Sequence, residues 1–143
     1  MFSRTFPPAH SPAKAPGSMN AQSFLTSSLA VILGGGVGAW LRFAAGQLIG
    51  PATFPFATLT VNIIGSFAMG LLAAWLARQG DGGEGWRLLL GVGVLGGFTT
   101  FSAFSLEIVQ LAQRGAVGTA ALYAALSLTG GVVALFIGLR LFA

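Results

Sequence analysis

Long apolar stretches separated by short polar connectors dominate the pattern of this chain. Four such stretches run over about 24–45, 56–77, 86–112 and 116–141. Each is close to the roughly 20 residues that an α-helix needs to cross about 30 Å of hydrocarbon. The connectors carry Gly or Pro and are locally polar, as turns between helices usually are. The pattern predicts an all-α membrane protein with four transmembrane helices per subunit, in one domain over 23–143.

The N-terminal residues do not follow this pattern. They hold four of the six prolines of the chain and lack the continuous apolar core that a cleavable signal peptide requires. Low hydrophobicity with many prolines is typical of segments that cannot bury enough surface to fold. We expect residues 1–22 to be a disordered extension before the first helix.

Composition supports a membrane location. Hydrophobic residues make up 55% of the chain, charged residues only 7%, and the mean hydropathy is +0.84. A water-soluble domain of this length could not bury so much apolar surface, so we expect membrane lipid around the helices. The net charge of +4 comes from Lys and Arg residues that are scattered singly. Because nucleic-acid-binding proteins gather such residues into a basic patch, we expect no nucleic-acid partner.

Few residues could carry enzyme chemistry. The chain has no cysteine, and its one histidine, His10, lies in the N-terminal extension. No nucleophile-and-base pair or cluster of metal ligands can be assembled, so we predict that the chain is not an enzyme. Transport is a different class of function that a chain with four spans could have. One such transporter would be a small dual-topology drug/proton exporter, which needs a carboxylate in the membrane. The absence of Asp and Glu from residues 1–80 disfavours it. A non-transporting assembly subunit is a further alternative.

Positive charges are nearly balanced between the two ends of the helices. Apart from the N-terminal extension, Arg78, Arg87 and Arg140 lie on the side of the termini, and Arg42 and Arg114 lie on the other side. This split has little power to orient the chain under the positive-inside rule, so insertion in both directions is possible. Four helices are also few for a pathway through the core of one subunit. An antiparallel, dual-topology homodimer is the closed symmetric assembly that fits both observations.

Uncharged polar residues recur at helical spacing within the apolar stretches. Thr58, Asn62 and Ser66 are four residues apart and share one face of the second helix. Asn62 lies near mid-membrane, where an unpaired amide costs on the order of several kcal/mol. The pattern leaves two roles open for it, a contact between helices or the lining of a pathway. Tyr123 and Ser127 form a second short polar track in the fourth helix, with simple packing as the alternative.

The segment 96–105, GGFTTFSAFS, departs most from an ordinary membrane helix. Two glycines and two β-branched threonines lower helix propensity there, at a depth where no water solvates freed backbone groups. We therefore expect the third helix to break near mid-membrane. Such a break is tolerated where it is buried in protein or lines a polar cavity, and its freed carbonyl groups can coordinate a cation. From the pattern alone, aromatic residues that fill a Gly-rich groove are the alternative.

Three segments resemble the signature segments of the Fluc fluoride-channel family, also called CrcB. They are GGGVGAWLRF (34–43), TLTVNIIGSFAMG (58–70) and GVGVLGGFTTFSAFSLE (91–107), in order and at the expected spacing. The likeness covers essentially the whole chain after the N-terminal extension, and its third motif is highly specific. The resemblance implies a passive fluoride channel that exports F⁻ across the bacterial inner membrane and relieves fluoride toxicity. It also implies an antiparallel homodimer with two pores and a structural Na⁺ at its centre.

The resemblance assigns roles to individual residues. The implied fluoride pathway comprises Asn62, Phe101, Phe104, Ser102, Ser105, Tyr123 and Arg42. The backbone carbonyl groups of Gly96 and Thr99 are implied to hold the Na⁺. Ala103 stands where the family usually has threonine, which removes a hydroxyl group from the motif.

The physical chemistry of these residues agrees with a pathway for fluoride. A small, strongly hydrated anion crosses most easily along neutral hydrogen-bond donors and the electropositive edges of aromatic rings, because a fixed positive charge at the centre would trap it. Arg42, Glu107 and Arg114 all fall near the ends of predicted helices. We expect Arg42 to concentrate anions at a vestibule and Glu107 to pair with a cation at a helix end.

Overall fold

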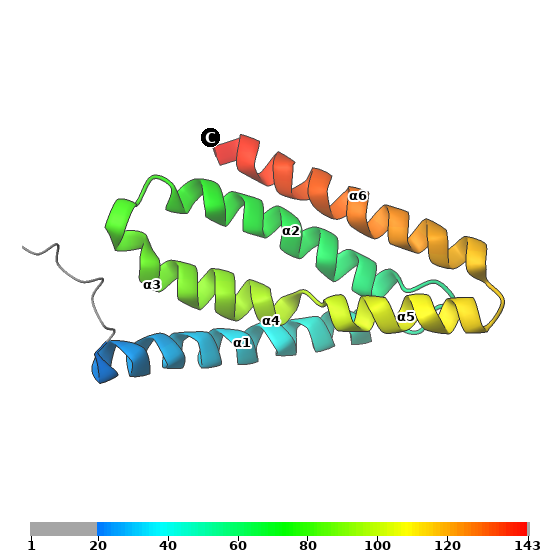
Figure 1. Ribbon diagram of the computed structural model, residues 1–143, viewed down its shortest axis with the longest axis horizontal. Coiled ribbons are helices and arrows are strands. Elements are labelled where there is room, and N and C mark those ends of the chain that lie inside the picture. Colours follow the sequence, from blue (N-terminus) through cyan, green and yellow to red (C-terminus); the bar gives the residue numbers. More distant parts are fainter. Residues whose placement is uncertain (1–19, 143) are drawn as a thin grey trace, which may run out of the picture.

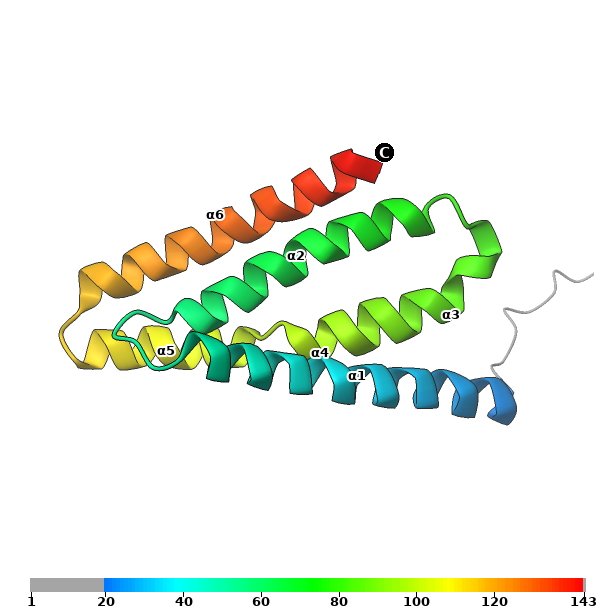
Figure 2. The same cartoon turned by 180° about the vertical axis from the view of Figure 1, so that it is seen from behind.

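Four helices of the protein are long and apolar enough to cross a membrane. The structure is a computed structural model, and it describes residues 20–142. The four spans are Ala21–Ile49 (α1), Phe56–Leu76 (α2), Glu84–Gln113 and Val117–Phe142 (α6). They run lengthwise beside one another, with the end of α6 at the same end of the molecule as the start of α1 (Figures 1 and 2). The predicted all-α protein with four membrane-spanning helices is confirmed.

Helix α1 begins earlier than the sequence predicted. The Asn20 side-chain oxygen accepts a hydrogen bond from the Ser23 N–H at 2.7 Å and so caps the helix. An N-cap of this kind stabilises a helix by about 1 kcal/mol relative to alanine. The first helical residues, Ala21 and Gln22, therefore fall within the segment 1–22 that we expected to be a disordered extension. The rest of that segment, residues 1–19, lies outside the described residues.

The third span is an interrupted helix. It consists of the short helix α3 (Glu84–Trp86), the π-helix η2 (Arg87–Leu95), the short helix α4 (Gly96–Phe98) and the longer helix α5 (Phe101–Gln113). The 3-10 turn η1 (Gly80–Gly83) precedes it. Between α4 and α5, Thr99 and Thr100 adopt extended backbone with ψ angles of 159° and 125°. The predicted break of the third helix is confirmed, and Figure 1 shows it near the middle of the span.

Glycines allow two pairs of helices to pack with their backbones in contact. A Cβ atom added to Gly38 of α1 would lie 2.0 Å from the Val94 carbonyl oxygen of η2. Between α2 and α6, a Cβ atom added to Gly70 would lie 2.2 Å from the Leu135 carbonyl oxygen. Lipid supplies no hydrophobic driving force between helices, so such close packing is what holds membrane helices together.

The two halves of the third span pack against different helices. The segments η2 and α4 lie along α1, whereas α5 lies against α6 (Figure 1). A buried cluster forms at the second contact, and it contains Phe104, Leu111, Ala120 and Tyr123. The break therefore directs the second half of the span toward the helix that carries Tyr123.

We predict that Gly38→Ala destabilises the protein by about 1–3 kcal/mol, because the added methyl group would overlap backbone atoms that cannot move aside. Gly36→Ala is the matched control. Nothing lies within 4 Å of a Cβ atom at Gly36, and alanine is the better helix former. Thermal unfolding in detergent measures both variants. Equal unfolding temperatures for the two variants would contradict this account of the packing.

Candidate functional site

Asn62 binds the extended backbone at the break. Its Nδ2 atom donates to the Thr100 carbonyl oxygen at 3.0 Å, and its Oδ1 atom accepts from the Thr100 N–H at 2.8 Å. One side chain thus supplies the donor and the acceptor that a neighbouring strand would provide. A primary amide carries two N–H groups, and no acceptor for the second lies among the described residues. The predicted role of Asn62 as a contact between helices is confirmed, because it joins α2 to the third span. Its second amide N–H remains free to donate beside the break.

The break also changes the hydrogen bonding of two carbonyl groups. In a continuous α-helix, the Gly96 carbonyl oxygen would accept from the N–H of Thr100, four residues later. That N–H donates to Asn62 instead. In the same way, the Thr99 carbonyl oxygen loses the Ala103 N–H, which donates to the Thr100 hydroxyl oxygen at 3.2 Å. The carbonyl groups of Gly96 and Thr99, for which the family resemblance implies a Na⁺, are therefore without their helical donors.

An open cavity of about 260 Å³ lies beside the break. Its lining residues come from α2, the break and α6, and none is charged: Asn62, Gly65, Ser66, Met69, Thr99, Thr100, Phe101 and Leu135. The Phe101 side chain at its edge is 75% exposed in the single subunit. We call this space the central cavity. It combines polar groups with an aromatic ring near the middle of the third span.

Aromatic rings lead from the central cavity into the core. The ring centroids of Phe101 and Phe104 lie 5.6 Å apart, and those of Phe104 and Tyr123 lie 5.2 Å apart. Phe104 is 7% exposed and Tyr123 is fully buried. Because the edges of aromatic rings are electropositive, such a series can favour an anion without carrying charge.

A buried hydroxyl group lies one helical turn beyond Tyr123. The Ser127 Oγ atom is buried and has no hydrogen-bond partner among the described residues. Leaving such a group unsatisfied costs about 1–3 kcal/mol, so water or an ion is the expected partner. Ser127 belongs to the polar track with Tyr123 that the sequence predicts, but it was not among the predicted pathway residues.

Glu107 lies within α5 and accepts two hydrogen bonds from hydroxyl groups. Thr58 of α2 donates at 2.7 Å and Tyr123 of α6 donates at 2.6 Å. The expectation that Glu107 pairs with a cation at a helix end is wrong, because the folding of α5 against α6 brings hydroxyl groups to it instead. The sequence did contain a signal for this residue. An isolated carboxylate within an apolar span is energetically expensive and is usually retained for function.

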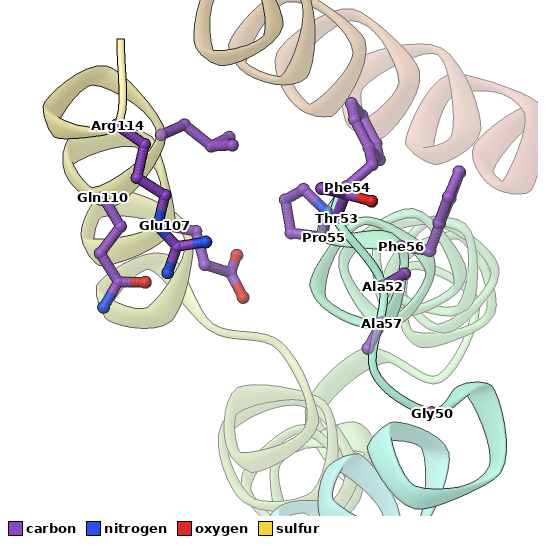
Figure 3. A pocket seen from close by; sticks show the side chains of 11 residues that line it. Gly50, Ala52, Thr53, Phe54, Pro55, Phe56, Ala57, Glu107, Gln110 and Arg114 are labelled. Carbon is purple, nitrogen blue, oxygen red and sulfur yellow. The ribbon is translucent and has the colours of Figure 1, made fainter. Parts of the chain in front are cut away.

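Glu107 also borders a second cavity, of about 270 Å³, at the end of the molecule where α1 joins α2. Figure 3 shows Glu107 and Gln110 of α5 and Arg114, the residue that follows α5, on one side, and Thr53 and Pro55 of the connecting loop on the other. Glu107, Gln110 and Arg114 lie on one helical face, because they are three and four residues apart. We call this space the mouth cavity. Glu107 therefore lies between the buried Tyr123 and an open cavity.

Three predicted pathway residues, Ser102, Ser105 and Arg42, line neither the central cavity nor the mouth cavity. The Ser105 hydroxyl donates to the Phe101 carbonyl oxygen of its own helix at 2.9 Å. The Ser102 hydroxyl is exposed and lies 3.3 Å from that of Thr100. Arg42 is half-buried on α1, and it lines neither the central cavity nor the mouth cavity. The structure brings together Asn62, Phe101, Phe104 and Tyr123, and it leaves Arg42 apart from them.

Most of the chain matches the model of a known protein family. The model described as "CrcB-like protein, Camphor Resistance (CrcB)" matches residues 29–139. The chain belongs to the CrcB family. The predicted family resemblance is confirmed.

Curated relatives in the CrcB family carry functional names. A protein of Novosphingobium aromaticivorans named fluoride-specific ion channel FluC is 59% identical over 122 residues, which cover 82% of this chain and 96% of the relative. The FluC protein of Caulobacter vibrioides is 49% identical over 116 residues, with 78% and 91% covered. That of Mesorhizobium japonicum is 50% identical over 117 residues, with 79% and 93% covered. The CrcB family is thus one of ion channels and not of enzymes, and this member is a multi-pass membrane protein.

We predict that Thr58→Val destabilises the folded protein by about 1.5–3 kcal/mol, because it removes a hydrogen bond to a charged and partly buried group. Thr129→Val is the matched control, since the exposed Thr129 hydroxyl bonds only to the Ala125 carbonyl oxygen of its own helix. Chemical unfolding in mixed micelles measures the difference. If Thr58→Val cost no more than Thr129→Val, the Glu107 contact would have no energetic importance.

Proposed function

We propose that the chain is a subunit of a fluoride-selective passive channel, which exports F⁻ across the bacterial inner membrane and so relieves fluoride toxicity. The observation that carries the proposal is an unbroken series of contacts between the two cavities. Phe101 lines the central cavity and contacts Phe104, Phe104 contacts Tyr123, and Tyr123 donates to Glu107 in the mouth cavity. The names of the relatives support fluoride as the ion.

The chemistry of this route suits a small halide. Fluoride must give up strongly bound water, and only groups that donate to it can compensate. The free N–H of Asn62, the unpartnered hydroxyl of Ser127 and the ring edges of Phe101 and Phe104 are such groups. They are neutral, so the ion is not trapped. Ser102 and Ser105 supply further hydroxyl groups near Phe101 if their present bonds are exchanged.

Glu107 occupies the position that an anion would take between two hydroxyl donors. Both the Thr58 and the Tyr123 hydroxyl protons are directed at its carboxylate. A fluoride ion that arrives from either cavity competes with the carboxylate for these protons, and repulsion between the two anions promotes onward movement. At the mouth cavity, Arg114 offsets the charge of Glu107 and raises the local concentration of anions. We assign the same effect to Arg42 at a vestibule outside the two cavities.

A second copy of the chain would complete the pathway. In the single subunit, Phe101 is 75% exposed and the central cavity is open. A polar passage open to acyl chains would not hold a hydrated ion, so a protein surface must close it. We propose an antiparallel, dual-topology homodimer with two pores, in agreement with the nearly balanced arginines on the two sides.

The carbonyl groups of Gly96 and Thr99 fit a structural Na⁺ at the centre of such a dimer. Both have lost their helical donors, and carbonyl oxygens are suitable ligands for a hard cation. The second subunit would contribute the same pair. The carbonyl oxygens would coordinate the ion, which would take the place of the hydrogen-bond donors that they lack in the membrane.

A proton-coupled exporter is the second candidate, because Glu107 is a carboxylate within the third span. Its bonds to Thr58 and Tyr123 favour the channel, since they direct the carboxylate toward neutral donors within the protein. An exporter would move its substrate only in response to a proton gradient. A channel passes fluoride without one.

We predict that the purified protein in liposomes releases fluoride far faster than chloride and without a proton gradient. Fluoride- and chloride-selective electrodes measure the release after the membrane potential is relieved with an ionophore. Empty vesicles prepared in parallel are the control. Fluoride release at the rate of empty vesicles, from protein shown to be folded, would exclude the channel.

We predict that Phe101→Ile and Asn62→Ala each reduce fluoride flux about tenfold or more, which corresponds to at least about 1.4 kcal/mol at the barrier. The first removes a ring edge. The second removes the free amide donor together with the two bonds to Thr100 that support the break, so flux is compared at equal amounts of folded, assembled protein. Phe24→Ile is the matched control, because Phe24 is also exposed and lies on α1 away from both cavities. Size-exclusion chromatography monitors assembly. Normal flux in both pathway variants would refute the proposed route.

A further inference from the structure

Two apolar grooves lie side by side on the outer surface of α6, near its C-terminal end. The first has a volume of about 410 Å³, lies between α2 and α6, and is lined by Ala73, Ala74, Ala77, Arg78, Phe136, Leu139 and Arg140. The second has a volume of about 380 Å³ and is lined by Val132, Val133, Phe136, Ile137, Arg140 and Leu141. The grooves share Phe136 and Arg140. Figure 1 shows the end of α6 beside the last turns of α2, where the first groove lies.

Phe136 and Arg140 form the ridge between the grooves. They are four residues apart and so lie on the same face of α6, and the Phe136 side chain is 59% exposed. On one side the small side chains of Ala73 and Ala77 leave the first groove hollow. On the other side of the ridge, the second groove is lined by the aliphatic residues Val132, Val133, Ile137 and Leu141. The surface therefore presents two apolar channels divided by an aromatic ring, with a guanidinium group one helical turn beyond the ring.

The polar end of this surface is positively charged. Arg78 lines the first groove together with Arg140. Arg78 is held in place by the Phe142 carbonyl oxygen, to which it donates, and by the Phe142 ring, whose centroid lies 5.7 Å away. A guanidinium group has five N–H donors, so this contact leaves others for a ligand. Glu84, six residues after Arg78 in the sequence, pairs with Arg87 at 2.7 Å.

We propose that this surface binds one anionic phospholipid, with the phosphate between Arg78 and Arg140 and one acyl chain in each groove. Two neighbouring apolar grooves that share a cationic residue, Arg140, match a molecule with two chains and one phosphate. Guanidinium groups bind phosphate through paired hydrogen bonds. A second copy of the chain fits less well, because the whole chain has only three Asp and Glu residues to set against these arginines. The inference does not depend on the fluoride pathway.

Native mass spectrometry tests the site with phosphatidylglycerol and phosphatidylcholine of identical acyl chains, added in equal amounts to the purified full-length protein. We expect the wild type to retain phosphatidylglycerol in preference. Replacing Arg78 and Arg140 together by Gln should lower its retention about tenfold. Retention of phosphatidylcholine should fall less, because it carries the same phosphate but no net negative charge. The matched control replaces Arg42 and Arg114 by Gln at the other end of the helices, and it should retain phosphatidylglycerol like the wild type.

A second variant tests the grooves without changing the charge. Ala73→Leu fills the first groove and should weaken the binding of both lipids, whereas Ala121→Leu, an exposed site on α6 outside both grooves, should not. This pair keeps the proposal testable if the arginine variant fails to fold. Equal loss of phosphatidylglycerol in the two arginine variants would overturn the proposal. Displacement of the lipid by an equal concentration of inorganic phosphate, or full lipid binding to Ala73→Leu, would overturn it as well.

Discussion

The structure depends on the need to satisfy backbone hydrogen bonds within the hydrocarbon. A helix meets this need with its own atoms, but the extended residues Thr99 and Thr100 cannot. The Asn62 side chain satisfies the backbone of Thr100, because it donates to the carbonyl oxygen and accepts from the N–H group of that residue. The Thr100 hydroxyl then caps the start of α5. A break that would otherwise cost on the order of several kcal/mol per unsatisfied group becomes a stable part of the fold.

The break determines which helices meet. Before it, η2 and α4 follow α1 through glycine contacts, and after it α5 packs against α6. This change of partner places Phe104 beside Tyr123 and Glu107 within reach of Thr58. The same break withdraws the helical donors from the Gly96 and Thr99 carbonyl groups. The polar features of the molecule thus follow from one interruption of one helix.

The distribution of charge agrees with a passage for an anion. No charged residue lines the central cavity, and the Glu107 carboxylate of α5 accepts hydrogen bonds from two hydroxyl groups. Arg114 lies farther out, in the mouth cavity. An anion would therefore meet positive charge where it is still hydrated and neutral donors where it has lost water. This order avoids a deep binding site in the middle of the membrane.

Local sequence pattern was sufficient to predict several features of this fold. The length of the apolar stretches predicted four spans, the glycines and threonines of 96–105 predicted the break, and three motifs predicted the family. Only the tertiary structure showed that Asn62 binds Thr100, 38 residues away, and that Glu107 binds Thr58, 49 residues away. It also placed Arg42 outside both cavities and left the buried Ser127 hydroxyl without a hydrogen-bond partner within residues 20–142. Periodicity reports which residues can face lipid, whereas hydrogen-bond partners depend on which helix faces meet after the chain has packed.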